Sequence, residues 1–164
     1  MHRSALIVGA TGLVGQRLLA RLLDDTDVSS VVALTRRPLS LPHPKLHEGV
    51  VDFASVADFA LPPVDDYFCC LGTTMAKAGS QAAFRAVDLD LPVTLARMAL
   101  AAGATRCFVV SALGADPRAT VFYHRVKGEL EAALGALPFA AVIAFRPSLL
   151  AGPRVGTRSG ERIG

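Results

Sequence analysis

The feature that most constrains the fold is a glycine-rich turn between an apolar segment and an amphipathic one near the start of the chain. Residues 5–8 are a short, fully apolar run typical of a buried strand, and residues 13–23 place apolar side chains at helical spacing. Gly9, Gly12 and Gly15 follow the GxxGxxG pattern across the junction. Gly9 permits a tight turn, Gly12 lets backbone approach a pyrophosphate, and Gly15 lets the helix pack closely on the sheet. Because the turn closes a predicted strand and opens a predicted helix, it indicates a dinucleotide phosphate site rather than a turn without a ligand.

Strand-length apolar runs alternate with helical segments along the rest of the chain. Further helices are predicted at residues 55–60 (a short one), 81–102 and 121–134, with Pro92 expected to kink or divide the long one. Alternation of this kind predicts an α/β fold, a Rossmann-type doubly wound parallel sheet in three layers with strand order 3-2-1-4-5-6. The remaining predicted strands are residues 31–34, 46–51, 67–71, 107–110 and 140–145.

Composition limits the class of protein. The 164 residues suffice for one domain, and 52% hydrophobic against 19% charged residues exclude general disorder. Apolar runs fall short of the roughly 18 to 20 residues of a membrane span, and the basic residues are scattered, so we expect neither a membrane nor a nucleic-acid partner. Cys69, Cys70 and Cys107 lack metal-ligand or redox spacing, which predicts reduced, buried thiols in a cytoplasmic protein without a metal. Residues 1–150 are expected to form the cofactor-binding domain, and residues 151–164 a tail that begins a lid or substrate region, truncated or missing here.

The residues after the second predicted strand indicate which dinucleotide is bound. NAD-selective sites place a carboxylate there, whereas this chain has Arg36 and Arg37 and no acid between Asp27 and Glu48. Guanidinium groups suit a 2′-phosphate, so NADP(H) is expected in preference to NAD(H). Other residues expected to contact the cofactor are Thr11, Leu13 and Val14 at the opening helix, Asp52 and Phe53 beside the adenine, and Leu71, Gly72 and Thr73 along the ribose.

A candidate catalytic set follows the fifth predicted strand. Ser111 ends that strand, and Tyr123 and Lys127 lie one turn apart on one face of the next helix. A free phenol has a pKa of about 10, and a neighbouring ammonium lowers it, so such a tyrosine can act as general acid or base. The serine hydroxyl would hold the substrate oxygen. The set predicts hydride transfer coupled to proton transfer at a carbonyl or alcohol; a tyrosine and lysine that merely share a helix face are the alternative.

With these motifs in place, the chain resembles the short-chain dehydrogenase/reductase superfamily, in the atypical branch around the Tat-interacting protein TIP30 (CC3) and its bacterial homologues. The resemblance implies an NADP(H) site, a triad of Ser111, Tyr123 and Lys127 in which Lys127 also contacts the cofactor, and Arg146, Pro147 and Ser148 packed beside the nicotinamide. Many members carry an asparagine that holds a proton-relay water; the matching position here is Asp88. The segments that carry the resemblance are residues 69–74, 77–79, 84–88, 111–116, 127–129 and 146–148.

Three functions remain open at this point. The first is an NADP(H)-dependent oxidoreductase acting on a small carbonyl or alcohol, with an unknown substrate. The second is a non-enzymatic regulatory or interaction protein that carries the dinucleotide. The third is a nucleotide-sugar epimerase or dehydratase, which would need a substantial C-terminal lobe. A homodimer through the long helices is a further option by analogy alone.

Overall fold

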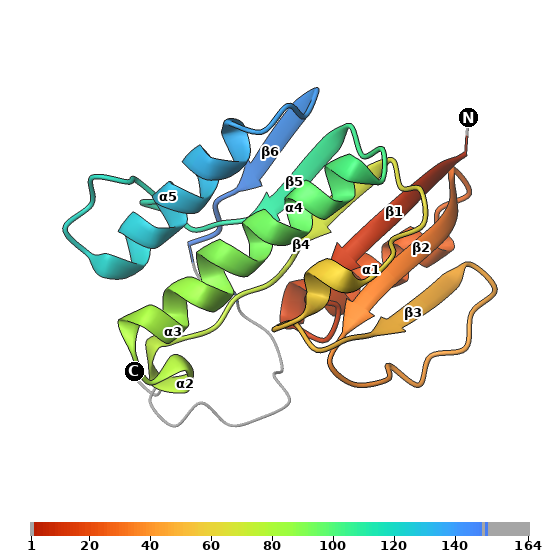
Figure 1. The fold of residues 1–164 in the computed structure, drawn as a ribbon, viewed down its shortest axis with the longest axis horizontal. Helices are drawn as coiled ribbons and strands as arrows, with labels where there is room; N and C mark the ends of the chain where they lie inside the picture. The colour runs from red at the N-terminus through yellow and green to blue at the C-terminus, as the bar shows by residue number, and fades with distance from the viewer. Residues whose placement is uncertain (1, 149, 151–164) are drawn as a thin grey trace.

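The computed structural model describes residues 2–148 and 150, which form one open sheet of six parallel strands with helices on both faces (Figure 1). The strand order is β3-β2-β1-β4-β5-β6, so the predicted fold and strand order are confirmed. The proposed tail, residues 151–164, lies outside the described residues. The strands are β1 (Arg3–Val8), β2 (Val28–Thr35), β3 (Leu46–Val50), β4 (Asp66–Cys69), β5 (Arg106–Val110) and β6 (Ala141–Phe145).

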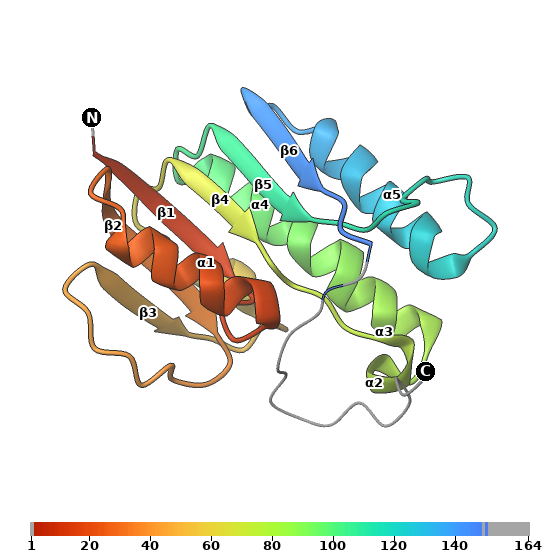
Figure 2. The same cartoon turned by 180° about the vertical axis from the view of Figure 1, so that it is seen from behind.

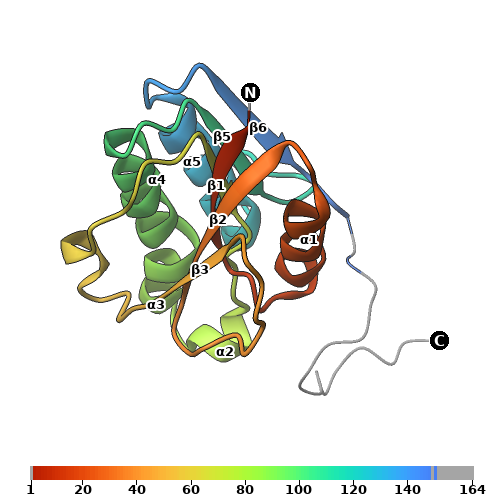
Figure 3. The same cartoon turned by 90° about the vertical axis from the view of Figure 1, so that its right-hand side faces the viewer.

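The helices are divided unequally between the two faces of the sheet. Helix α1 (Leu13–Asp24) packs on one face, where Figure 2 shows it in front of the β1 side of the sheet. The opposite face is covered by α3 (Gln81–Arg85), α4 (Leu91–Ala101) and α5 (Phe122–Gly135), and the edge-on view of Figure 3 shows the resulting three layers. Helix α2 (Met75–Ala78) lies next to α3, near the carboxyl ends of the strands.

Two hydrophobic clusters, one on each face, hold the layers together. Leu6 and Val8 of β1 belong to the cluster that contains Leu95 of α4 and Leu130 of α5. Ala5 and Ile7 belong to the other cluster, with Leu19 and Leu22 of α1. A strand that is buried on both faces needs apolar residues at consecutive positions, which explains the uninterrupted run in β1.

The long helix predicted for residues 81–102 is divided, but not by a simple kink. A π-helical segment, η2 (Ala86–Asp90), separates α3 from α4, and Pro92 stands in the first turn of α4. Pro92 has no N–H to donate to the carbonyl four residues earlier, so the regular α-helical pattern cannot run through this point. The fully buried Asp88 lies on the π-helical segment.

The other differences from the predicted elements are small. Strand β2 begins three residues earlier than expected, and the expected helix at residues 55–60 is a single 3₁₀ turn, η1 (Val56–Asp58). Helix α2 was not predicted, because four residues are too few to show a helical period. Its start is fixed by the Thr74 hydroxyl, which accepts a hydrogen bond from the Lys77 N–H.

Candidate functional site

A groove runs across the carboxyl ends of β2, β1, β4 and β5. It consists of three adjoining hollows, of which the central one shares lining residues with both neighbours. Gly9, Arg36 and Phe53 line the central hollow and the one beside β2, and Gly12 and Thr73 line the central hollow and the one beside β5. Open parallel sheets bind ligands at this edge, where the strand order changes direction.

The glycine turn forms the floor of the groove. Gly9 has φ of +78°, and a Cβ at this position would lie 2.5 Å from the Cys70 carbonyl carbon. The Gly12 N–H donates a hydrogen bond to the Gly9 carbonyl at 3.0 Å, which closes the turn before α1 begins. A Cβ at Gly15 would overlap the Gly9 carbonyl, so a side chain there would push α1 off the sheet. The turn can keep this shape only with glycine at positions 9 and 15.

The hollow beside β2 is bordered by cations. Arg36 and Arg37 follow β2 directly, line this hollow together with Thr11 and Phe53, and are exposed. Neither arginine forms an ion pair within residues 2–148 and 150. The Thr35 hydroxyl donates a hydrogen bond to the Arg37 carbonyl at 2.8 Å and so shapes the turn that carries both guanidinium groups.

Asp52, expected beside the adenine, is not brought to the groove. Its Oδ1 accepts a hydrogen bond from the Ala54 N–H at 3.0 Å, and its side chain is exposed outside the lining of the hollows. The neighbouring Phe53 does line the groove. The structure therefore separates two residues that the sequence had placed together.

The hollow beside β5, about 290 Å³ in volume, contains the three residues of the expected triad. Ser111, Tyr123 and Lys127 line it together with Gly12, Leu13 and Val14 at the start of α1. Ser111 is buried, and its hydroxyl lies close enough to the Glu131 carboxylate to lower the pKa of that group, although the contact lacks the geometry of a regular hydrogen bond. Tyr123 is 36% exposed, and its ring packs edge-on against Phe84 of α3 with 5.9 Å between centroids.

Lys127 is buried beside Asp88. The Lys127 Nζ lies 2.7 Å from Asp88 Oδ1, and the two side chains are 4% and 0% exposed. This contact is an ion pair without hydrogen-bond geometry, since Oδ1 has no hydrogen bond within the described chain. The second oxygen, Oδ2, accepts a hydrogen bond from the Thr73 N–H at 2.8 Å. Sequence reasoning noted Asp88 as a departure from an asparagine but missed its pairing with Lys127; an acid between Val87 and Leu89 was the available signal.

The residues that follow β6 do not all line the groove. Pro147 and Ser148 line the same hollow as the triad, whereas Arg146 does not. Its guanidinium donates to the Glu131 carboxylate, with Nε 3.0 Å from Oε1. Burial raises the pKa of Glu131, but hydrogen bonding by Arg146 and Ser111 and the positive charges of Arg146 and Lys127 together outweigh it and lower the pKa overall. The structure thus pairs Arg146 with Glu131 of α5, and its contact with a nicotinamide stays a prediction.

Cys70 also lines the groove, and its thiol is held protonated. Burial raises the pKa of Cys70 and of Cys107 to about 12, and it raises the pKa of Cys69 as well. All three cysteines are free thiols; Cys69 and Cys107 are buried as predicted, whereas Cys70 is only half-buried. A thiol with so high a pKa is a poor nucleophile at neutral pH.

Two further polar residues reach the groove that the sequence did not single out as site residues. Thr74 and Lys77, at the start of α2 and within it, line the hollow that holds the triad.

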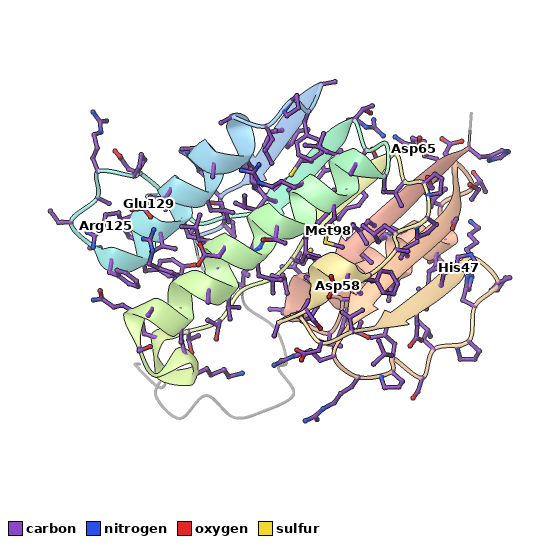
Figure 4. All side chains as sticks on the ribbon, in the orientation of Figure 1. His47, Asp58, Asp65, Met98, Arg125 and Glu129 are labelled. Carbon is purple, nitrogen blue, oxygen red and sulfur yellow. The ribbon has the colours of Figure 1, made fainter. Side chains whose placement is uncertain are left out.

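The two charged residues labelled on α5 in Figure 4 form contacts outside the hollow lining. Arg125 donates a hydrogen bond to the Ala119 carbonyl at 2.9 Å, and Glu129 pairs with Arg85 of α3.

The fold and the groove together define a class. A parallel sheet of order 3-2-1-4-5-6 with a glycine turn after β1 is a dinucleotide-binding domain of Rossmann type. A family model described as NAD(P)H-binding matches residues 9–141, and the chain belongs to this family.

Two relatives in sequence agree with this assignment. The chain is 36% identical over 165 residues to Protein HTATIP2 of Rattus norvegicus, covering 98% of this chain and 68% of that protein. It is 37% identical over 162 residues to Protein FMP52, mitochondrial, of Coccidioides immitis (strain RS), covering 90% and 66%. The resemblance to the branch around TIP30, the HTATIP2 protein, is therefore confirmed. The chain spans about two thirds of the length of these relatives.

Solved structures share the fold at low identity. The Bordetella bronchiseptica enzyme WbmG in complex with NAD superposes with a TM-score of 0.74 at 17% identity, covering 96% of this chain and 57% of that one. The human epimerase family protein SDR39U1 (isoform2) with NADPH gives 0.62 at 17% identity, covering 87% and 52%. This chain spans about half the length of these structures. Within the part that the structure describes, the helices are too short or too polar to cross a membrane.

Proposed function

We propose that this protein is an NADP(H)-dependent oxidoreductase of the short-chain dehydrogenase type, which transfers a hydride to or from a small carbonyl or alcohol. The observation that carries the proposal is the shared hollow: Ser111, Tyr123 and Lys127 line the same space as Gly12 and the first residues of α1. A triad that can transfer a proton thus borders the space where the nicotinamide end of a bound dinucleotide would lie.

The residues of the groove fit a dinucleotide. Gly12, Leu13 and Val14 line the groove where α1 begins, and the first N–H groups of a helix have no partner within the helix. Those N–H groups and the positive end of the helix dipole would hold the pyrophosphate. Phe53 would pack against the adenine in the hollow beside β2. Leu71, Gly72 and Thr73 would follow the ribose, and Pro147 and Ser148 would border the nicotinamide.

The preference for NADP(H) rests on Arg36 and Arg37. Both guanidinium groups border the hollow beside β2 and lack an acidic partner in the described chain, so they are free to bind a 2′-phosphate. The solved neighbours are described with NAD in one case and NADPH in another, and therefore do not decide between the two.

A bound nicotinamide would supply or accept the hydride, and residues of the chain would transfer the proton. The Tyr123 phenol would donate a proton to the substrate oxygen on reduction and accept it on oxidation. The buried Ser111 hydroxyl, which lines the same hollow, would hydrogen-bond the same oxygen and hold it beside the phenol. The Lys127 ammonium, one helical turn from Tyr123, would favour the phenolate.

Replacement of the phenol tests the reaction. We expect the purified protein to oxidise NADPH in the presence of some member of a panel of small aldehydes, ketones and quinones. Tyr123→Phe should reduce kcat by at least about 100-fold, because it removes the general acid, and should leave the Kd for NADPH within about twofold. Val121→Ala, an exposed residue at the start of the same helix, serves as control. Activity that survives in Tyr123→Phe would refute the assigned chemistry.

Two other functions are distinguished by the same measurements. Tight NADPH binding without turnover on any substrate would favour a regulatory protein that carries the dinucleotide. Conversion of a nucleotide sugar without net NADPH consumption would favour an epimerase. The cytoplasmic location and a homodimer stay predictions, and the mitochondrial location in the FMP52 name is stated of that protein alone.

A further inference from the structure

The carboxylate of Asp88 connects two parts of the site that come from distant segments of the chain. One oxygen accepts the Thr73 N–H of the loop after β4, and the other lies 2.7 Å from the Lys127 ammonium on α5. Asp88 is itself fully buried and lines the hollow that holds the triad. A single side chain therefore fixes both the loop beside the groove and the lysine beside the phenol.

An amide could not make the same two contacts. The two donors approach different oxygens of Asp88, and asparagine has only one oxygen. Its NH₂ group would face either the Thr73 N–H or the Lys127 ammonium, donor against donor. The carboxylate also balances the ammonium charge in a place that is shielded from water.

We propose that Asp88 is a positioning residue of this site, whose carboxylate holds Lys127 and the Thr73 loop together and limits the effect of the Lys127 charge on the Tyr123 phenol. This inference rests on the proposed function for the role of Tyr123. Tyr123, Asp88 and Lys127 line the same hollow, so the charges of the pair act on the space that the phenol borders. The neutral pair Asp88–Lys127 acts on the phenol less strongly than a lone ammonium would.

The other charged groups around the groove keep their charge whether or not position 88 carries a carboxylate. Arg85–Glu129 and Arg146–Glu131 are ion pairs and contribute little net charge. Among the described residues, Lys77 and Cys70 also line the hollow, the His124 ring packs 5.7 Å from that of Tyr123, and the buried Cys69 lies near the Asp88–Lys127 pair. A difference between the protein and an Asp88→Asn variant therefore reports on the charge at position 88.

The composition of the chain allows a test that does not depend on turnover. The chain has two tyrosines and no tryptophan, and the Tyr67 hydroxyl is buried and donates to the Pro92 carbonyl. Burial raises the pKa of Tyr67 well above the usual value, so tyrosinate absorbance that develops first on raising the pH belongs to Tyr123. Subtracting the curve of Tyr123→Phe removes any remaining contribution of Tyr67.

The experiment is a spectrophotometric pH titration of the full chain and its variants. In Asp88→Asn the absorbance midpoint should fall by on the order of one pH unit relative to the wild type, because the Lys127 charge is no longer balanced. Asp90→Asn, an exposed acid two residues away, should leave the midpoint unchanged. If turnover is found, the pH dependence of kcat should shift in the same direction and by a similar amount.

A double variant keeps the test decisive if Asp88→Asn does not fold. Asp88→Asn with Lys127→Met carries neither charge, and its midpoint should return to within about 0.3 pH units of the wild type, since both members of the pair are removed. An Asp88→Asn midpoint equal to that of the wild type, or a double variant whose midpoint stays shifted, would overturn the proposal. Absence of turnover in the wild type would contradict the proposed function without affecting the titration.

Discussion

The two ends of the groove hold their cations in opposite ways. Beside β2, Arg36 and Arg37 are exposed and have no acidic partner among the described residues. Around the triad, apart from the exposed Lys77, the cations are paired: the buried Lys127 with Asp88, and Arg146, outside the groove lining, with Glu131. The unpaired arginines leave positive charge available to a ligand, whereas the ion pairs around the triad hold separate segments of the protein together.

The difference follows from solvation. An exposed guanidinium stays hydrated and charged without a partner. It can therefore remain unpaired until a phosphate binds, with little loss in the free energy of unfolding. A buried ammonium loses its hydration and requires a counter-charge nearby. We therefore expect substitutions at the β2 end to change affinity, and substitutions around the triad to change stability as well.

The largest expected effect is on the buried pair. Lys127→Met leaves the Asp88 carboxylate buried without its partner, which should lower the free energy of unfolding by about 3–5 kcal/mol. Adding Asp88→Asn removes the unpaired charge and should restore most of that loss. Urea unfolding monitored by circular dichroism would measure both variants. If Lys127→Met lowered the free energy of unfolding by less than about 1 kcal/mol, the Asp88–Lys127 pair would not be holding the fold together at the triad end of the groove.

The next effect belongs to the β2 end and should be confined to binding. Arg36→Ala combined with Arg37→Ala should weaken NADPH binding by roughly 10- to 100-fold, because charge-assisted hydrogen bonds to the 2′-phosphate are lost. Binding of NADH should change by less than about threefold, and the free energy of unfolding by less than about 0.5 kcal/mol. Calorimetric titration with both nucleotides would measure this. Equal losses for the two nucleotides would mean that these arginines do not bind the 2′-phosphate.

A smaller effect, dependent on pH, comes from two thiols, Cys70 in the groove lining and Cys107 in the core. The pKa of Cys70 and of Cys107 is raised by burial from 9.0 to about 12. Below pH 9 both thiols are protonated in the folded and the unfolded chain, so their contribution to stability is complete. Between pH 9 and 12 only the unfolded chain ionises, and the free energy of unfolding falls as the pH rises.

Each thiol should account for a loss of about 1 kcal/mol at pH 10 relative to pH 8. Urea unfolding at the two pH values would measure the slope, and Cys107→Ala should make it shallower. A slope unchanged by that substitution would mean that Cys107 ionises as readily in the folded protein as in the unfolded one.

The smallest effect is expected for the exposed ion pair at the triad end. Arg146→Ala breaks the contact with Glu131, in which the arginine side chain is 52% exposed. Exposed pairs contribute about 0–1 kcal/mol, so the variant should unfold within 1 kcal/mol of the wild type. Its Kd for NADPH should stay within about twofold, because the guanidinium is bound to Glu131 and Arg146 does not line the three hollows of the groove. A large loss of affinity would instead support the nicotinamide contact that the sequence suggested.

The sequence by itself was sufficient for the fold and for most of the groove lining. Apolar runs such as residues 5–8 and the glycines at 9, 12 and 15 are local patterns, and the order of the strands follows from how such units pack. The residues expected at the turn, after β2 and on α5 do line one groove. Their assignment to a cofactor and a reaction remains a proposal.

Only the tertiary structure decided the direction of individual side chains. Asp52 caps its own loop, Arg146 turns toward Glu131, and Asp88 reaches Lys127 through a π-helical segment. The contacts of Arg146 and Asp88 depend on partners far along the chain, whereas the Asp52 contact is local, with an N–H two residues further on. None of the three contacts leaves a periodic trace in the sequence. Periodicity determines which face of an element is buried, whereas the ion pairs within that buried face depend on how separate elements meet.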